Sequence, residues 1–217
     1  YRGQALANFD STYRYYFIQT LDLFEKNSTL LDSFFYLKKN LLVIKQEIQS
    51  KKINIQNKDV YSTGEPVTYH LSFKNVQTLH INIIKLSSIE FQINKQKIQT
   101  EQLINTAAFK TITLTLPDIK DYQAHGSVIE MDSLPLGYYA VLYSDSIITN
   151  TNKNSNYFTF NVSNITAINN DSRIFVLDRE SGLPLNDARL LVKYKSTNNG
   201  PIKNAPIKKV NREGYAI

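Results

Sequence analysis

The first fifty residues carry apolar side chains at the three- and four-residue spacing of helices, with Gly3 as their only Gly and no Pro. One run comprises Leu6, Phe9, Tyr13, Tyr16, Phe17, Leu21 and Phe24, and a second comprises Leu31, Phe34, Phe35, Leu37, Leu41, Leu42, Ile44 and Ile48. Between them, Asn27-Ser28-Thr29 is an N-cap signal, and Asp32 suits the positive end of the second helix dipole. We therefore predict an αα-hairpin over residues 1–50 that packs its broad apolar face on its neighbours.

From residue 52 the pattern changes to the alternation of β-strands. Apolar positions alternate with polar ones over Val67–Phe73 and Leu79–Ile83, and Lys74–Gln77 between them predicts a hairpin turn. Further strands are expected at Ile53–Ile55, Ile89–Ile93, Thr111–Leu116, Ser127–Met131, Tyr138–Tyr143 and Tyr157–Val162. Short strands separated by Gly, Pro and Asn turns are typical of an antiparallel Ig-like β-sandwich, which we assign to residues 52–163.

The last part of the chain begins a second β pattern. Residues 164–171 are polar and Asn-rich and indicate a linker. Strand-like runs then recur at Ile174–Leu177, Arg189–Tyr194, Ile207–Val210 and from Tyr215 onward. These strands are too few to close a sandwich, so residues 172–217 are predicted to be the start of a second, truncated β-sandwich. The expected fold is mainly β with a helical lead-in.

Composition excludes several classes of function for this chain. The chain is 42% apolar, with 14 Tyr and 11 Phe, enough for packed cores. It has no Cys, which excludes disulfides, thiol catalysis and Cys-based zinc sites. The formal net charge of +6 is spread over single or paired lysines such as Lys51 and Lys52, unlike the basic stripe of a nucleic-acid-binding protein. No apolar run approaches the ~20 residues of a membrane span. Without an initiator Met or a signal peptide, the chain is interpreted as a piece of a longer protein.

Two histidines are the first candidate for chemistry. His70 and His80 fall on the polar face of the predicted hairpin, where pairing of Phe73 with Leu79 would make them diagonal neighbours about 7–8 Å apart. A metal site needs at least a third ligand, and the sequence indicates none. We therefore interpret both as surface histidines.

A second candidate is the segment around His125. Asp121, His125 and Ser127 are the residue types of a hydrolase triad. Triads are assembled from distant segments, however, and a polar loop that enters a strand accounts for these residues. No nucleophile elbow, phosphate-binding loop or dinucleotide fingerprint occurs. We expect no enzyme activity and assign no catalytic, cofactor-binding or metal-binding residue.

Short motifs follow one another in an informative order. Gly64-Glu-Pro-Val67 and Leu71-Ser-Phe-Lys-Asn-Val76 open the first sandwich, and Leu134-Pro-Leu-Gly-Tyr-Tyr139 and Phe158-Thr-Phe-Asn-Val-Ser163 close it. Val176-Leu-Asp-Arg-Glu-Ser-Gly-Leu-Pro-Leu185 and Asn211-Arg-Glu-Gly-Tyr215 then open the next domain. In this order they resemble the N-terminal macroglobulin-like domains of bacterial alpha-2-macroglobulin family proteins of the Bacteroidetes type. The resemblance extends over nearly the whole chain and includes the helical lead-in.

The resemblance implies a function that the residues alone do not. Such proteins are large secreted or periplasmic protease traps that are often lipid-anchored. They contain a bait region and sometimes a Cys-containing thioester. We assign neither of these features to residues of this chain. We expect this chain to be a non-catalytic scaffold segment of a protease inhibitor of the cell envelope. The parent protein would be periplasmic, anchored to the outer membrane, or extracellular. Its partners would be other domains of the parent chain and, through parts outside this chain, a target endopeptidase. We expect no nucleic-acid partner. Membrane contact would occur only through an anchor outside this chain. The alternative is an Ig-like surface adhesin or carbohydrate-binding module array.

Overall fold

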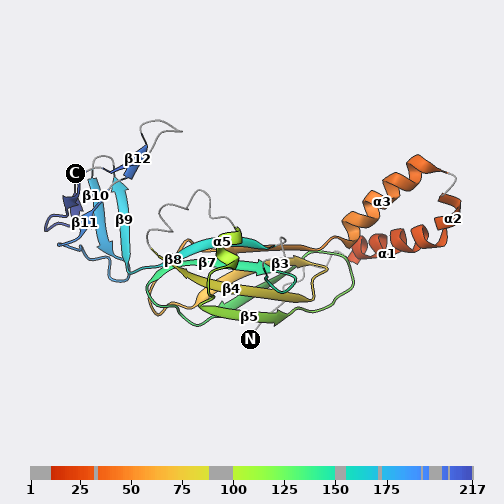
Figure 1. The fold of residues 1–217 in the computed structure, drawn as a ribbon, viewed down its shortest axis with the longest axis horizontal. Coiled ribbons are helices and arrows are strands. Elements are labelled where there is room, and N and C mark those ends of the chain that lie inside the picture. The colour runs from red at the N-terminus through yellow and green to blue at the C-terminus, as the bar shows by residue number, and fades with distance from the viewer. Residues whose placement is uncertain are drawn as a thin grey trace. The chain divides into compact units, whose positions relative to one another are not determined.

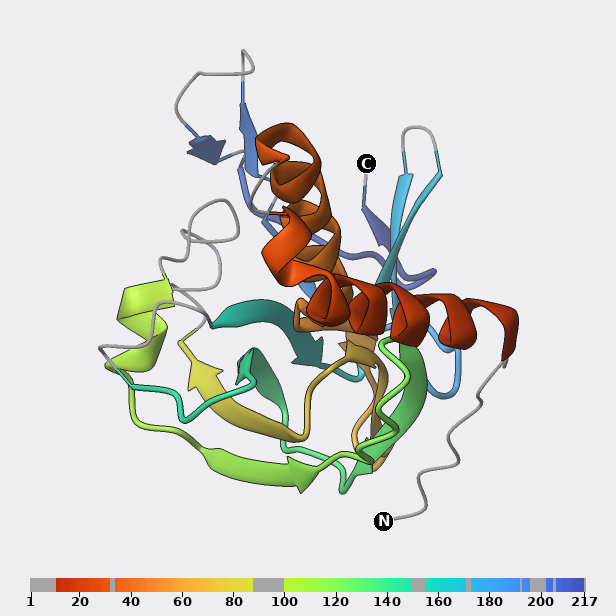
Figure 2. The same ribbon diagram turned by 90° about the vertical axis from the view of Figure 1, so that its right-hand side faces the viewer.

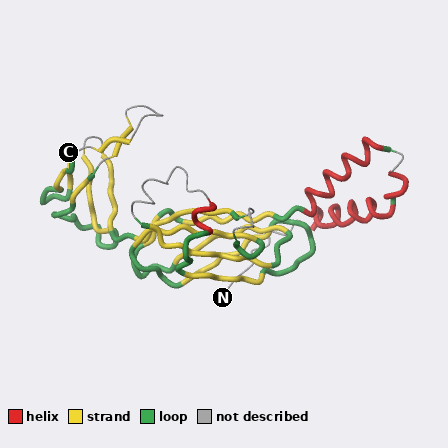
Figure 3. The backbone as a smooth tube through the Cα atoms, viewed as in Figure 1, coloured by secondary structure: helices red, strands yellow, loops and turns green. Residues whose placement is uncertain are grey.

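The computed structural model describes residues 11–31, 34–87, 100–149, 155–170, 173–191, 193–195, 202–204 and 206–216. Two compact units interleave along the chain. The first unit comprises Tyr1–Asp59, Pro66–Asp132 and Gly137–Phe160, and the second comprises Val60–Glu65, Ser133–Leu136 and Asn161–Ile217. Helices occur early in the chain and strands dominate the rest (Figure 1 and Figure 3). The predicted fold class, mainly β with a helical lead-in, is therefore confirmed.

The helical lead-in consists of α1 (Ser11–Lys26), α2 (Ser28–Leu31) and α3 (Phe35–Gln49). Asn27 was expected to start the second helix but instead ends the first, since its backbone N–H and its side-chain Nδ2 both donate to the Leu23 carbonyl, at 3.1 and 2.8 Å. Those donors satisfy a carbonyl that the end of α1 leaves free. α3 begins after Phe34 without a side-chain cap.

The helices contact each other through a narrow stripe. Leu21 is buried, Phe17 and Phe24 are partly buried, and the Lys45 ammonium lies 4.8 Å from the Phe24 ring centre. Ile48 is buried and Leu41 is partly buried, but other described apolar side chains stay open, with Phe35 72% exposed. The expectation that the broad apolar face packs on its neighbours is therefore wrong for these side chains.

The first unit also contains a two-sheet sandwich (Figure 2). One sheet has the order β1-β3-β6, from β1 (Lys52–Asn57), β3 (Val67–Lys74) and β6 (His125–Met131). The other runs β8-β7-β4-β5, from β8 (Asn156–Val162), β7 (Gly137–Ser144), β4 (Thr78–Leu86) and β5 (Lys110–Thr115). Aromatic rings join the sheets: Tyr69 of β3 lies 5.3 Å from Phe158 and 6.3 Å from Phe160 of β8, between ring centres. This edge-to-face packing forms the core of the sandwich.

The predicted β3–β4 hairpin is wrong. β3 pairs with β1 and β6, whereas β4 pairs with β5 and β7, so Lys74–Gln77 crosses from one sheet to the other. Phe73 and Leu79, the presumed cross-strand partners, are both buried in the core, on different sheets. Alternation marks which face of a strand is buried, but it does not name the neighbouring strand.

A second apolar cluster covers the other face of β4 and β7. Ile84 and Leu86 are buried there beside Leu142, although they alternate out of phase with Leu79, Ile81 and Ile83. The short helix α5 (Thr100–Ile104), absent from our sequence prediction, contributes the buried Leu103. The predicted strand Ile89–Ile93 lies outside the described residues.

The second unit contains small antiparallel sheets. β9 (Ile165–Asn170), β10 (Arg173–Asp178) and β15 (Tyr215–Ala216) form one sheet in the order β15-β10-β9. β11 (Arg189–Leu190) pairs with β14 (Lys208–Lys209), and β12 (Lys193–Lys195) pairs with β13 (Ile202–Asn204). β2 (Val60–Tyr61) runs parallel to the end of β8, opposite Asn161 and Val162.

The linker predicted at residues 164–171 is a strand over most of its length. β9 pairs with β10 in continuous register from Ile165↔Asp178 to Asn170↔Arg173. Polar composition suggested a linker, but the backbone of β10 supplies the hydrogen bonds that make this segment a strand. The proposed division into residues 1–50, 52–163 and 172–217 stays a prediction. Among the described helices, none is both long and apolar enough to cross a membrane.

Candidate functional site

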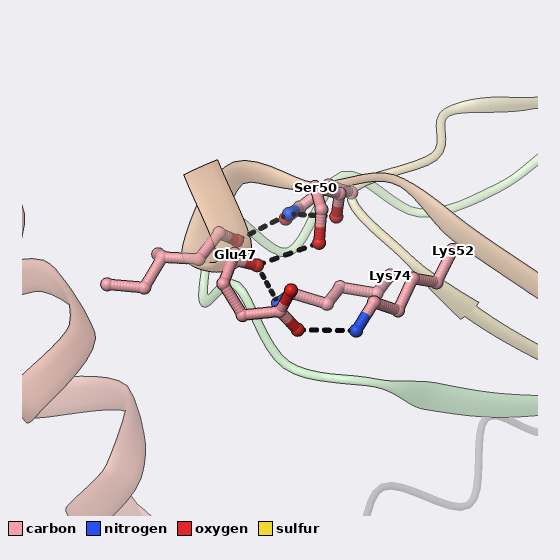
Figure 4. Close-up of polar contacts among 6 residues, drawn as sticks. Glu47, Ser50, Lys52 and Lys74 are labelled. Carbon is pink, nitrogen blue, oxygen red and sulfur yellow. Dashed lines mark hydrogen bonds and ion pairs between the residues drawn. The ribbon is translucent and has the colours of Figure 1, made fainter. Parts of the chain in front are cut away.

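Polar side chains gather where α3 meets the sandwich, in a group that we call the helix anchor: Glu47, Ser50, Lys52, Lys74 and Asn75. Figure 4 labels the first four of them. The Asn75 side-chain Nδ2 donates to the carbonyls of Ile48 and Ser50, at 2.8 and 3.0 Å. The Lys74 ammonium donates to the Glu47 carbonyl at 2.7 Å. The last carbonyls of a helix have no partner within the helix, so the crossing between β3 and β4 acts as the C-cap of α3.

Charge supports the same arrangement. The Lys52 ammonium lies 2.5 Å from Glu47 Oε1, and this hydrogen bond and ion pair lower the pKa of the Glu47 carboxyl. Partial burial lowers the pKa of the Lys74 ammonium, partly offset by the attraction of Glu47. Asn75 itself has a φ of 55°, in the left-handed region that Asn tolerates better than most residues.

A groove of about 470 Å³ adjoins the helix anchor and is lined in part by Lys51, Lys52, Lys74 and Phe73. Its cations already have acceptors, since Lys51 pairs with Asp145 at 2.9 Å and Lys52 with Glu47. The lining side chains do not bring a nucleophile together with a general base.

Asp121 and His125 form a buried pair. His125 Nε2 lies 2.8 Å from Asp121 Oδ1, which also accepts the Gln123 backbone N–H at 3.0 Å. The Phe73 ring centre is 5.8 Å from the imidazole centre. Ser127, the third residue type of the imagined triad, lies farther along β6 opposite Leu71. The pair thus ties the loop before β6 to the start of that strand, which fits a structural role.

His70 and His80 are not brought together in one sheet. His70 lies on β3 opposite Val128 and Gln56, while His80 lies on β4 with its Nδ1 3.2 Å from Thr113 Oγ1. The diagonal pair imagined from the sequence depended on a β3–β4 hairpin that does not form. Within the described parts of the chain, no group of three or more His, Asp or Glu side chains could hold a metal.

In the second unit, the motif Asp178-Arg-Glu-Ser-Gly-Leu forms a tight turn. Asp178 Oδ1 accepts both the Ser181 N–H and the Ser181 hydroxyl at 2.8 Å, and these bonds lower the pKa of the Asp178 carboxyl. The Asp178 N–H donates to the Leu183 carbonyl at 2.8 Å, and Gly182 takes a φ of 71°. The residues of this quoted motif therefore serve to form one turn.

Arg179 extends from this turn into a cluster that we call the arginine clamp: Arg179, Ser163, Asn164, Ile165 and Thr63. Its guanidinium donates to the carbonyls of Ser163 and Ile165, at 3.1 and 2.9 Å, and its backbone N–H donates to the Asn164 carbonyl at 2.6 Å. The Asn164 side-chain oxygen accepts the Thr63 N–H at 3.1 Å and the Thr63 hydroxyl. The sequence pointed to the Arg179 motif but not to this role, because its acceptors are backbone carbonyls.

The second quoted motif, Asn211-Arg-Glu-Gly-Tyr215, is also a turn. Asn211 Oδ1 accepts the backbone N–H groups of Glu213 and Tyr215, both at 3.0 Å. Gly214 has a φ of 83°, and a Cβ at this position would lie 2.5 Å from the Pro184 Cβ. Both motifs thus use Asx-type bonds and a left-handed Gly to reverse the chain.

Comparison with solved structures shows which known fold this chain has. No protein-family model matches this chain, and no curated protein does. The chain is similar to a crystal structure of native alpha-2-macroglobulin from Escherichia coli spanning domains MG0-NIE-MG1, with a TM-score of 0.53 and 12% sequence identity over 76% of this chain. This chain has the fold of macroglobulin-like domains. It spans 56% of the length of that solved fragment. A second E. coli fragment, spanning NIE-MG1, is 12% identical over 77% of this chain and 86% of the fragment, with a TM-score of 0.49.

Proposed function

We propose that this chain is a non-catalytic scaffold segment of an alpha-2-macroglobulin-like protein that traps proteases. The observation that carries the proposal is the likeness of its fold to the macroglobulin domains of the E. coli protein. Trapping itself would belong to the parent protein, because a trap has to enclose its captive and to change conformation after cleavage. The role of this segment is to position other domains.

The use of polar residues supports a scaffold. Asn75 and Arg179 each donate two side-chain hydrogen bonds to backbone carbonyls. The buried pair of Asp121 and His125 ties a loop to a strand. These groups hold chain segments in place, and none of them is arranged around a position that a substrate could occupy.

The finer parts of the proposal rest on the quoted motifs. We propose a parent protein of the Bacteroidetes type, located in the periplasm or anchored to the outer membrane. An adhesin or carbohydrate-binding array has no structural observation in its favour, and it serves below as a competing outcome.

The parent protein provides the test. It is incubated with several endopeptidases, and the cleavage of a large protein substrate is compared with that of a small peptide substrate. We expect stoichiometric loss of protein cleavage with peptide cleavage retained, and no such effect from the 217-residue chain alone. Undiminished protein cleavage with the parent would overturn the proposal, as would trapping by the chain alone. Specific retention of the parent on immobilised glycans, without trapping, would favour the adhesin.

A further inference from the structure

The strand β5 forms an open edge of the sandwich. It is the last strand of the sheet ordered β2-β8-β7-β4-β5, and among the described strands it pairs with β4 alone. Figure 1 shows β5 along the lower margin of the sandwich. An edge strand presents backbone N–H and C=O groups that can pair with another extended strand. β5 therefore offers a surface for strand addition.

The register with β4 determines which backbone groups of β5 face this edge. The Leu116 N–H donates to the Gln77 carbonyl at 2.8 Å, and these two residues continue the register in which Leu114 lies opposite Leu79. In an antiparallel ladder, pairs that exchange both hydrogen bonds alternate with pairs that exchange none. The even-numbered residues of β5 therefore direct their backbone groups to β4. The odd-numbered threonines direct theirs to the open edge: Thr111, Thr113 and Thr115.

The sequence of β5 leaves this edge unprotected. Proteins commonly block an open edge with charged side chains, Pro or a bulge. Residues 111–115 read Thr-Ile-Thr-Leu-Thr, without a charged residue, Pro or Gly. The edge strand β9 differs, because the Arg179 guanidinium already donates to the Ile165 carbonyl at 2.9 Å. The contrast suggests that the β5 edge is kept available for a partner strand.

The five residues of this edge are complementary to themselves. If two copies of β5 lie antiparallel across a twofold axis at Thr113, that residue faces its own copy and Thr111 faces Thr115 of the second copy. These are the residues with backbone groups at the open edge, so each facing pair can exchange both hydrogen bonds. Their exposed side chains form a ladder of threonines, whereas the partly buried Ile112 faces Leu114 of the second copy.

We propose that β5 is a self-association edge, through which two copies of this chain join their sheets by antiparallel β5–β5 pairing. A second copy is the occupant because the available backbone groups and the side chains are both symmetric about Thr113, as a twofold interface requires. Lys110, at the start of the strand, would face Leu116 of the second copy, so the two lysines do not meet. This association goes beyond protease trapping and needs no protease.

The dimer should be weak. A single pair of edge strands buries less area than a standard interface, so we expect a dissociation constant between about 1 µM and 1 mM. Sedimentation equilibrium of the 217-residue chain measures it. Hydrogen exchange followed by NMR adds a readout for single residues. The amides of Thr111, Thr113 and Thr115 should gain protection as the protein concentration rises, whereas those of Ile112 and Leu114 should be protected by β4 at every concentration.

Two double variants with the same composition test the register. Thr111→Glu with Thr115→Lys places each new carboxylate opposite a new ammonium of the second copy, so dimerisation should persist or tighten. Thr111→Glu with Thr113→Lys makes the same change in net charge but brings two ammonium groups face to face at the twofold axis. Since opposite charges across a strand pair stabilise it and like charges destabilise it, we expect the second variant to have a dissociation constant at least about tenfold above that of the first.

Three results would overturn the proposal: wild type that stays monomeric up to about 1 mM, the weak end of the expected range, a dimer that both double variants weaken equally, or a dimer without concentration-dependent protection of the three threonine amides. Circular dichroism and urea unfolding show whether each variant keeps the fold of the monomer. If Thr111→Glu with Thr113→Lys unfolds, Thr113→Asp replaces it, because it brings two carboxylates together at the same axis and should weaken the dimer likewise.

Discussion

At the scale of single residues, side chains that bond to the backbone hold this molecule at its turns. Asn75 reaches back to the end of α3, and Arg179 reaches back to the start of β9. Backbone carbonyls at the ends of elements are obligatory acceptors, and leaving them unpaired costs free energy. Asn75 and Arg179 thus serve to pair backbone carbonyls, in keeping with the proposed scaffold role.

Replacing Asn75 separates its two contributions. Asn75→Ala removes the bonds to Ile48 and Ser50 and also places a less tolerant residue at a φ of 55°. We expect it to lower the free energy of unfolding by about 1–3 kcal/mol. Asn75→Gly loses the same bonds but accepts the backbone angle, so its loss should be smaller by up to about 1 kcal/mol. Urea unfolding of both variants checks this, and equal losses would show that the backbone angle contributes nothing.

Two glycines give a second matched pair. Gly182 and Gly214 both have positive φ, but open space surrounds the position of a Cβ at Gly182, whereas at Gly214 a Cβ would overlap Pro184. We expect Gly182→Ala to cost about 1 kcal/mol, the penalty of the left-handed backbone alone. Gly214→Ala should cost clearly more, because Pro184 or the turn has to shift. Thermal unfolding compares them, and an equal loss of stability would contradict the close approach of Pro184 to Gly214.

At the scale of elements, the β9–β10 sheet depends on the turn that follows it. The Asp178 carboxylate closes that turn through Ser181, and the backbone of Asp178 pairs with Ile165 at the start of β9. A carboxylate that accepts two hydrogen bonds is stabilised in its charged form. We therefore expect this turn to respond to acid.

The sign of the pH effect follows from the lowered pKa of Asp178. A group with a depressed folded pKa stabilises the fold fully above its unfolded value, about 3.9, and loses that contribution as the pH falls through the folded value. We expect an NMR titration of the Ser181 amide proton to have its midpoint below about 3.9. Asp178→Asn, which keeps an acceptor but does not titrate, should abolish the transition. A midpoint at or above the ordinary value would refute the turn geometry.

At the scale of the whole molecule, the two units differ in their cores. The first buries large aromatic and aliphatic side chains such as Tyr69, Tyr139 and Leu142. Among the described residues, the second unit buries fewer apolar side chains: Tyr61, Leu134, Val162, Val176, Val210 and Ala216. Since buried apolar area drives folding, the second unit should be the less stable of the two.

Two Leu→Ala variants test whether the units unfold separately. Leu142 is buried in the first unit and Leu134 in the second, and each truncation should cost about 2–5 kcal/mol. We expect hydrogen exchange measured by mass spectrometry in increasing urea to show the second unit opening first. Leu134→Ala should move only that transition, and Leu142→Ala should move the later one. A single transition shifted by both variants would show that the units unfold together.

The positions of most described strands were determined by the sequence alone. Alternation over Val67–Phe73 and Leu79–Ile83, and the apolar runs around Tyr138–Tyr143 and Tyr157–Val162, coincide with β3, β4, β7 and β8. The turns around Gly182 and Gly214 lie within two motifs quoted from the sequence, and their left-handed backbone and Asx bonds require particular residue types at fixed offsets. These signals are local, so the sequence reports them directly.

Partner choice was decided only by the tertiary structure. Nothing in Lys74–Gln77 distinguishes a hairpin turn from a crossing between sheets, because both need a polar reversal after a buried strand. Likewise β9 is a strand through the backbone of β10, and the arginine clamp uses carbonyls that carry no residue identity. Hydrogen bonds between backbones are the same for every residue except Pro, so which strands meet depends on how the whole chain buries its apolar faces.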